Sequence, residues 1–214
     1  IKEIAQIAVP HSVNRLLLTL LSGIEMVLIP QRLLLAGINR TDSLSVYGIF
    51  TGMALPLILF PSALTSSLCT MLLPVISEAQ ACGKLSAITA AIRKLCLSCL
   101  ALGLVCFLGF FFLGDFAGNL LFDNALAGSF IRALAWICPL MYLNPALFAI
   151  LNGLGKTSQV LVHNLTGVAI RIAFIVFAIP VFGISGFFAG MLINQLVTFL
   201  LAVRSIRKSL AEAV

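Results

Sequence analysis

The sequence predicts an all-α membrane protein, a polytopic bundle of six transmembrane helices. Of its 214 residues, 61% are hydrophobic and 9% are charged, whereas soluble domains have about 25% charged residues. The mean hydropathy is +1.17, far above that of a soluble protein. The apolar runs exceed the roughly 20 residues that a helix needs to cross the hydrocarbon core. They also lack the alternation typical of barrel strands, so helices are expected throughout.

Short polar clusters separate the apolar runs and define the expected helices in order. The first helix ends at Gly37, and the second is followed by Pro74. A long connection, Gly114–Gly128, follows the third helix. The fourth ends at the turn that begins with Asn152, and Gly183 separates the fifth from the sixth. The expected helices are residues 4–36, 44–73, 86–113, 129–152, 157–180 and 184–204, within a single transmembrane lobe, residues 1–214.

Lys and Arg residues near the span ends predict the orientation, because cytoplasmic loops carry an excess of them. Eight lie on the side of residue 1: Lys2, Lys84, Arg93, Lys94, Lys156, Arg204, Arg207 and Lys208. Three lie on the opposite side: Arg32, Arg40 and Arg132. This bias predicts that both ends of the segment are cytoplasmic. Asp42, Asp115 and Asp123 are then expected on the outer side.

Composition and motifs argue against several other functions. The net charge is +6, but no basic run is interleaved with aromatics on a solvated face, so nucleic acid is not an expected partner. Cys96 and Cys99 form a C-x-x-C pattern without a nearby His, which favours packing over metal or redox chemistry. No metal or cofactor is expected. The chain opens at Ile1 without a signal-peptide pattern, so we interpret it as part of a longer polypeptide.

The first helix carries a polar stripe along one face. At 3.6 residues per turn, the stripe falls within an arc of about 100° and extends about 21 Å along the axis. Its members are His11, Asn14, Arg15, Leu18, Ser22 and Glu25. A charge at bilayer depth costs about 2.5–3.5 kcal/mol, so such residues usually face a cavity or a partner. We expect the stripe to line a substrate cavity. A structural network that holds helices together is the alternative.

Arg15 and Glu25 are ten residues apart, so they cannot pair within one helix, and each requires a partner elsewhere. On the fifth helix, Asn164 and Arg171 share a face, and Arg171 lies about 22 Å along the axis from Lys156. Arg171 could thus reach the outer part of a cavity, or extend to the membrane surface as a snorkelling side chain.

Prolines and small residues suggest interrupted helices and close helix contacts. Pro56, Pro61 and Pro74 loosen the second helix, either as a functional break or as a static kink. The sixth helix contains Gly186-x-x-x-Gly190, which predicts close packing, and then Asn194 and Gln195, which are further cavity candidates.

Three segments carry a family resemblance: Ile29–Gly37, the connection Leu73–Gly83, and Leu151–Lys156. Their order and spacing resemble one half of the multidrug/oligosaccharidyl-lipid/polysaccharide (MOP) exporter superfamily. The chain looks most like the C-terminal six-helix lobe of bacterial polysaccharide-transport and stage V sporulation protein B-like flippases. The resemblance covers essentially the whole chain, and it implies one lobe of a MATE-like transporter in the bacterial cytoplasmic membrane.

The resemblance further implies a cavity between two lobes that opens alternately to each side. The N-terminal lobe of the same polypeptide and the membrane lipids are the implied partners, and the cargo is an anionic lipid-linked saccharide. Arg15 is the foremost candidate to bind the phosphates, with Arg171 second; Asn14, Ser22 and Glu25 would meet sugar hydroxyls or a coupling cation. The alternative within transport is a cation-coupled multidrug antiporter with Glu25 as its protonation site. A polyprenyl-substrate membrane enzyme or an assembly subunit is less favoured, so we expect no enzyme activity.

Overall fold

The computed structural model describes residues 2–81 and 85–211. Within these ranges, some helical residues have side chains outside the description: residues 2–11, 13–15, 17, 22, 72–73, 75–77, 79–81, 85–88 and 210. The elements, in order, are α1 (Lys2–Leu35), α2 (Arg40–Ile49), the π-helix η1 (Phe50–Ala54), α3 (Leu55–Leu59), α4 (Ser62–Ala81), α5 (Leu85–Phe122), α6 (Ala125–Ala135), α7 (Cys138–Gly153), α8 (Thr157–Phe177), α9 (Ile179–Phe182) and α10 (Ile184–Ala211).

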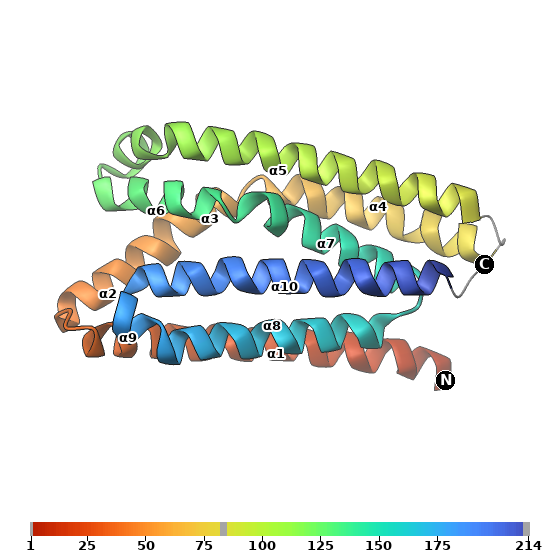
Figure 1. Cartoon of the computed structure of the whole chain (residues 1–214), viewed down its shortest axis with the longest axis horizontal. Helices are drawn as coiled ribbons and strands as arrows, with labels where there is room; N and C mark the ends of the chain where they lie inside the picture. Colours follow the sequence, from red (N-terminus) through yellow and green to blue (C-terminus); the bar gives the residue numbers. More distant parts are fainter. Residues whose placement is uncertain (1, 82–84, 212–214) are drawn as a thin grey trace.

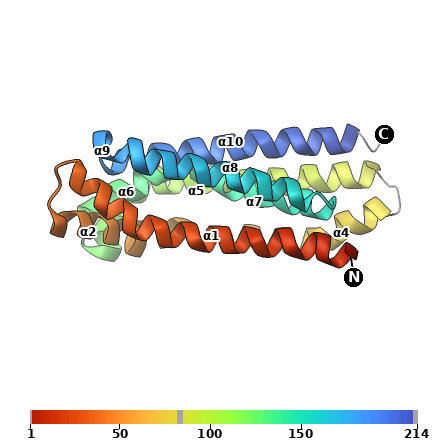
Figure 2. The same cartoon turned by 90° about the horizontal axis from the view of Figure 1, so that it is seen from below.

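The long helices run along a common axis, and the first turn of α1 lies at the same end of the bundle as the last turn of α10 (Figure 1). A view turned by 90° shows the same arrangement (Figure 2). Among the described residues, five helical segments are long and apolar enough to cross a membrane, or six if the bent pair α6–α7 is one span. The prediction of an all-α polytopic membrane bundle is confirmed.

The bundle has two groups of helices with α10 between them (Figure 1). Helix α1 packs along α8, and α8 packs against α10, which also contacts α7. On the other side, α5 packs against α6 and α7, and α4 packs against both α5 and α7. The side chains that face outward are largely Leu, Val, Met and Phe, as is expected where lipid is the solvent.

One sequence expectation requires correction at the C-terminal end of α5. The expected connection Gly114–Gly128 is helical through Phe122, and only Asp123 and Asn124 separate α5 from α6. The side chain of Asn124 caps α6 by accepting hydrogen bonds from two backbone N–H groups of its first turn, at 2.9 and 3.1 Å. Gly118, within the expected connection, lies in α5 and serves helix packing against α6.

Two of the expected spans are interrupted. The expected helix 44–73 is divided into α2, η1, α3 and α4, with a break at Phe60 and Pro61, and α4 continues past Pro74. The expected helix 129–152 is divided into α6 and α7, which meet at an angle of 53°. Pro61 and Pro139 lack the N–H that a continuous helix would need, which explains both interruptions.

A buried tyrosine connects the two interrupted segments. Tyr142 of α7 is fully buried, and its hydroxyl donates a hydrogen bond of 2.5 Å to the backbone carbonyl of Ile58 in α3. Ile58 lies just before the break at Pro61, where the regular helical hydrogen bonds are disrupted. The tyrosine therefore compensates for an interrupted backbone with a side-chain bond from a neighbouring helix.

Small residues allow the closest approaches between helices. A Cβ atom at Gly118 of α5 would overlap the backbone of Gly128 in α6, and one at Gly190 of α10 would lie 2.5 Å from the side chain of Phe174 in α8. The predicted close contact through Gly186-x-x-x-Gly190 is confirmed, because Gly186 is equally crowded by Ala178. These positions require the absence of a side chain.

Replacement of Gly118 by Ala should destabilise the bundle. The added methyl group would push α5 from the backbone of α6, a form of overpacking that costs about 1–3 kcal/mol. Gly109→Ala is the matched control on the same helix, because a Cβ atom at Gly109 has no neighbour within 4 Å among the described residues. Thermal unfolding of both variants in detergent checks the prediction, and equal melting temperatures would contradict it.

Candidate functional site

A half-open cavity of about 390 Å³ is lined by α1, α7, α8, α10 and the segment where α3 meets α4. Its wall combines apolar and polar side chains, and most of the polar ones are neutral amides and hydroxyls. The lining residues are Leu18, Leu21, Leu55, Leu59, Ser62, Ser66, Met141, Asn144, Pro145, Phe148, Asn164, Gly167, Val168, Arg171, Met191, Asn194, Gln195 and Thr198. This volume falls in the range of about 300–1,000 Å³ that is usual for small-ligand pockets.

The charged part of the site is an ion pair between α1 and α8. Arg171 Nη2 donates to Glu25 Oε2 at 2.5 Å. The side chains are 9% exposed for Glu25 and 25% exposed for Arg171, so the pair is largely withdrawn from the surface. Glu25 lies on the buried face of α1 with Leu21 and Ile29, at the four-residue spacing that places side chains above one another.

This geometry supplies the partner that Glu25 requires. The carboxylate is held by a guanidinium from a helix 146 residues further along the chain, so each charge is neutralised inside the bundle. Removing one member of a buried pair leaves an uncompensated charge and costs about 3–5 kcal/mol. The pair therefore holds α1 against α8 beside the cavity.

An amide cluster forms the opposite part of the wall. The side-chain nitrogen of Asn144 in α7 lies 2.5 Å from Gln195 Oε1, 3.0 Å from the backbone oxygen of Gln195 and 3.1 Å from Thr198 Oγ1. Thr198 in turn donates to the backbone oxygen of Asn194 at 2.8 Å. Asn144 is 3% exposed, so α7 and α10 are joined by polar contacts within an apolar interior.

Several polar atoms at this site have no hydrogen-bond partner among the described residues. They are Asn144 Oδ1, Asn194 Oδ1, Arg171 Nε and Glu25 Oε1. A buried polar atom without a partner costs about 1–3 kcal/mol, and such atoms are rare in native proteins. All four are buried against neighbouring side chains, and three of them belong to residues that line the cavity.

The structure brings three of the predicted site residues together. Arg171 and Asn164 line the cavity, and Glu25 is bonded to Arg171. Leu18, from the stripe on α1, also lines it. The side chains of the other stripe members lie outside the described part of the structure; these residues are His11, Asn14, Arg15 and Ser22. Their expected place in the cavity therefore stays a prediction.

Asn144 is the site residue that the sequence prediction missed. Its signal in the sequence is an amide within an apolar run, immediately before Pro145. His163 of α8 is buried, and its Nε2 lies 2.9 Å from Ser205 Oγ in α10. His163 thus joins α8 to α10 and does not line the cavity.

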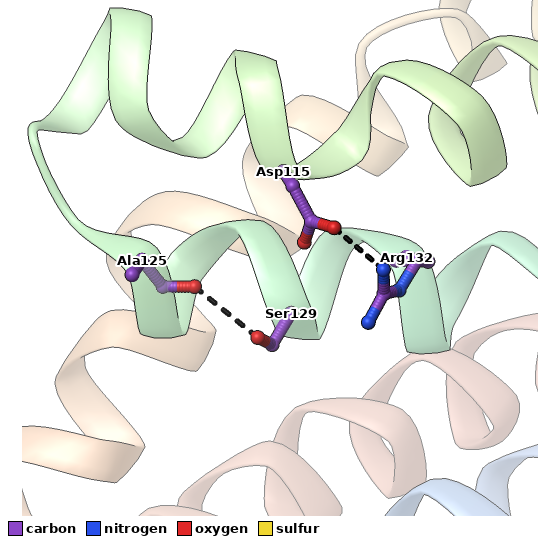
Figure 3. Close-up of polar contacts among 4 residues, drawn as sticks. All are labelled: Asp115, Ala125, Ser129 and Arg132. Atoms are coloured by element: carbon purple, nitrogen blue, oxygen red, sulfur yellow. Dashed lines mark hydrogen bonds and ion pairs between the residues drawn. The ribbon is translucent and has the colours of Figure 1, made fainter.

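A second ion pair, between α5 and α6, lies away from the cavity. Figure 3 shows Arg132 of α6 directed toward Asp115 of α5, with Nη1 and Oδ2 2.6 Å apart. Asp115 had been expected in a loop without a basic neighbour, but it is helical and paired. Both side chains are about half exposed, at 52% and 50%, so the pair contributes about 0–1 kcal/mol to stability.

Comparison with known proteins identifies two relatives. The chain is 25% identical over 210 residues to stage V sporulation protein B of Bacillus subtilis (strain 168), covering 97% of the chain and 40% of that protein. It is 25% identical over an alignment of 218 positions to sporulation protein YkvU of the same organism, covering 100% of the chain and 48% of YkvU. The chain is a distant homologue of both proteins.

The resemblance to stage V sporulation protein B-like proteins is therefore confirmed. The chain spans less than half of the length of each of these two relatives. No protein-family model matches the chain, and no solved structure matches it.

Replacing one member of the Glu25–Arg171 ion pair should destabilise the protein more than replacing both members. We expect Arg171→Leu to cost about 3–5 kcal/mol, because it leaves the Glu25 carboxylate buried without its partner. The double variant Glu25→Leu/Arg171→Leu should recover most of this loss, since an apolar pair often replaces a buried ion pair without penalty. Unfolding free energies measured in detergent check both values.

Arg132→Leu provides the control, because its pair with Asp115 is exposed and should cost no more than about 1 kcal/mol. A double variant as unstable as Arg171→Leu alone would contradict the interpretation of a buried, mutually compensating pair.

Proposed function

We propose that the chain forms one half of a membrane transporter that moves an anionic lipid-linked saccharide across the cytoplasmic membrane by alternating access. The observation that carries this proposal is the polar cavity inside a bundle of membrane-spanning helices, with a buried ion pair in its wall. A merely structural bundle has no need for a space of this size lined by amides and hydroxyls. Intramembrane polar residues mark substrate and ion pathways.

The rest of the polypeptide would supply the facing lobe. The two homologues are each more than twice as long as the part that the chain matches, which is consistent with a second bundle in the same polypeptide. In this proposal both ends of the chain are cytoplasmic, as the bias of Lys and Arg toward one end of the bundle predicts. The two lobes would rock against each other about a central cavity formed between them, in the manner of transporters with paired bundles.

The phosphates of the cargo need a cation that is free to bind them. Arg171 is already neutralised by Glu25, so it is a weak candidate for this role. Arg15 lies ten residues before Glu25 on α1, about 15 Å along the axis, and has the planar guanidinium that binds phosphate oxygens in a bidentate manner. We assign the phosphate contact to Arg15.

A second candidate function is transport coupled to a cation that binds at the Glu25 carboxylate. A buried Glu25 beside a cavity favours it, but a proton or metal ion at Glu25 would have to displace Arg171. The transporter would then resemble a cation-coupled antiporter. Unchanged dependence of transport on pH and sodium in Glu25→Gln would remove Glu25 from that role.

Arg15→Ala in the full-length protein should lower flipping of a lipid-linked saccharide at least tenfold. Hydrogen bonds to charged groups contribute about 1.5–3 kcal/mol, and 1.4 kcal/mol corresponds to a factor of ten. Arg15→Lys should retain partial activity, because a point charge replaces the planar fork. The measurement is the protection of a fluorescent polyprenyl-diphosphate saccharide from an external reductant in proteoliposomes.

Arg132→Ala is the control, since it removes an arginine from a half-exposed pair outside the cavity and should leave flipping unchanged. Normal flipping by Arg15→Ala would rule out the phosphate role. A chemically altered lipid at the end of the assay would instead indicate an enzyme.

A further inference from the structure

Two basic side chains lie next to each other near the start of α5. Arg93 and Lys94 are both exposed, and neither makes a hydrogen bond or an ion pair with another described residue. Residues 82–88, which precede them in the sequence, contain no Asp or Glu and one further base, Lys84. Arg93 and Lys94 are therefore two cations that the described part of the protein leaves uncompensated.

The length of α5 places these two cations at a membrane interface. The twenty residues 95–114, between Lys94 and Asp115, include no charged residue. At 1.5 Å per residue they extend about 30 Å, which is the thickness of the hydrocarbon core. Asp115 and Arg132 are half exposed, and charges that face acyl chains are costly, so their pair marks the opposite interface. Arg93 and Lys94 thus lie at the level of the lipid headgroups.

The aromatic residues support this placement. Trp136 follows Arg132 by four residues and is 57% exposed. Its ring lies against those of Phe107 and Phe111, with centroid distances of 5.0 and 5.8 Å. Tryptophan is enriched where a membrane meets water, so Trp136 belongs to the same interface as the Asp115–Arg132 pair.

An open hollow borders the two cations. Among the described residues, it is lined by Thr89, Ala90, Arg93, Lys94 and Leu97. Figure 1 shows the start of α5 at the end of the bundle where both chain termini lie. In the orientation proposed above, this is the cytoplasmic side, and the anionic lipids of that leaflet attract basic side chains.

An exposed apolar stripe continues from the hollow along the same face of α5. Leu97, Leu104 and Leu108 follow Arg93 at spacings of four, seven and four residues, which places them on one side of the helix. From Leu97 to Leu108 the stripe extends about 16 Å, close to half of the hydrocarbon core of about 30 Å. Two cations at the headgroup level and an apolar stripe one leaflet deep match the anionic head and the acyl chain of a phospholipid.

The chemistry of the two cations selects the kind of headgroup. The planar guanidinium of Arg93 can bind two oxygens of a phosphate, and the ammonium of Lys94 adds a point charge beside it. A zwitterionic headgroup brings its own ammonium group, which two neighbouring cations repel. An anionic headgroup brings no such cation, so it is the better partner.

We propose that the start of α5 binds an anionic phospholipid, with its phosphate held by Arg93 and Lys94 and an acyl chain along Leu97, Leu104 and Leu108. The inference goes beyond the proposed function and does not rest on it, since no described lining residue of the cavity belongs to α5. The lipid is a bound partner of the bundle and not its cargo. Because it binds the folded protein, it also stabilises the fold by mass action.

Native mass spectrometry of the purified full-length protein in a non-ionic detergent tests the site. The probes are phosphatidylglycerol, which is anionic, and phosphatidylcholine, which is zwitterionic. We expect the wild type to bind phosphatidylglycerol more tightly than phosphatidylcholine. Arg93→Gln/Lys94→Gln should weaken phosphatidylglycerol binding about 10- to 30-fold, the effect of two cations beside an anionic headgroup. Both side chains are exposed and lack a described partner, so the variant should keep its melting temperature in the absence of added lipid.

Arg204→Gln/Arg207→Gln is the matched control. It removes two exposed arginines of α10 at the same end of the bundle, and neither of them lines the hollow. This variant should bind phosphatidylglycerol as the wild type does. Equal weakening in both double variants would show a general attraction of basic residues to anionic lipid and would overturn the site on α5.

Two further results would overturn the proposal: equal affinity of the wild type for the two lipids, or unchanged phosphatidylglycerol binding in Arg93→Gln/Lys94→Gln. Inorganic phosphate separates a lipid site from a site for a free anion. Complete displacement of phosphatidylglycerol by inorganic phosphate would show that the acyl chains contribute nothing, and the lipid site would be wrong. The flipping assay tests the proposed function separately, because the described cavity lining does not include α5.

Discussion

The Glu25–Arg171 ion pair is the interaction on which the arrangement of the cavity depends. Neither charge is tolerable alone inside a membrane bundle, so each fixes the position of the other. The pair joins α1 to α8, and α8 packs on α10 through the glycines Gly167 and Gly190. The ion pair and the close packing next to it thus position α1, α8 and α10, which form three walls of the cavity. The same bond neutralises Arg171, the charged side chain among the described lining residues.

Much of the fold follows from the sequence because lipid leaves the backbone few choices. Long apolar runs in a membrane must be helices, and these runs predicted the helical bundle. The errors occur where one residue type has two physical meanings. The segment Gly114–Gly128 was expected to be a connection, but Gly118 within it is a position where the backbones of α5 and α6 meet closely. Asp115 was expected in the connection after the third helix, but it lies within α5, which continues to Phe122, and it pairs with Arg132 of α6.

The candidate site was predictable only in part, and for a similar reason. Charges such as Glu25 and Arg171 are conspicuous in an apolar chain because they are expensive there. Their pairing across 146 residues was not predictable, since periodicity fixes a face of a helix but not its neighbour. Asn144 carried a weaker signal, because a single amide in a span is common in helix packing. Its role becomes clear only in the structure, where Gln195, 51 residues away, accepts a hydrogen bond from its nitrogen.

The interruptions of the helices and the position of the cavity are related. The break between α3 and α4, at Pro61, and the bend between α6 and α7 both belong to the side that faces α1 and α8 across the cavity. Interrupted helices have fewer backbone hydrogen bonds to resist bending, so this side is the more deformable one. The side of α1, α8 and α10 is continuous and held by a buried ion pair. The Tyr142–Ile58 hydrogen bond joins α7 to α3 across these two interruptions, so the more deformable side is held together at one point.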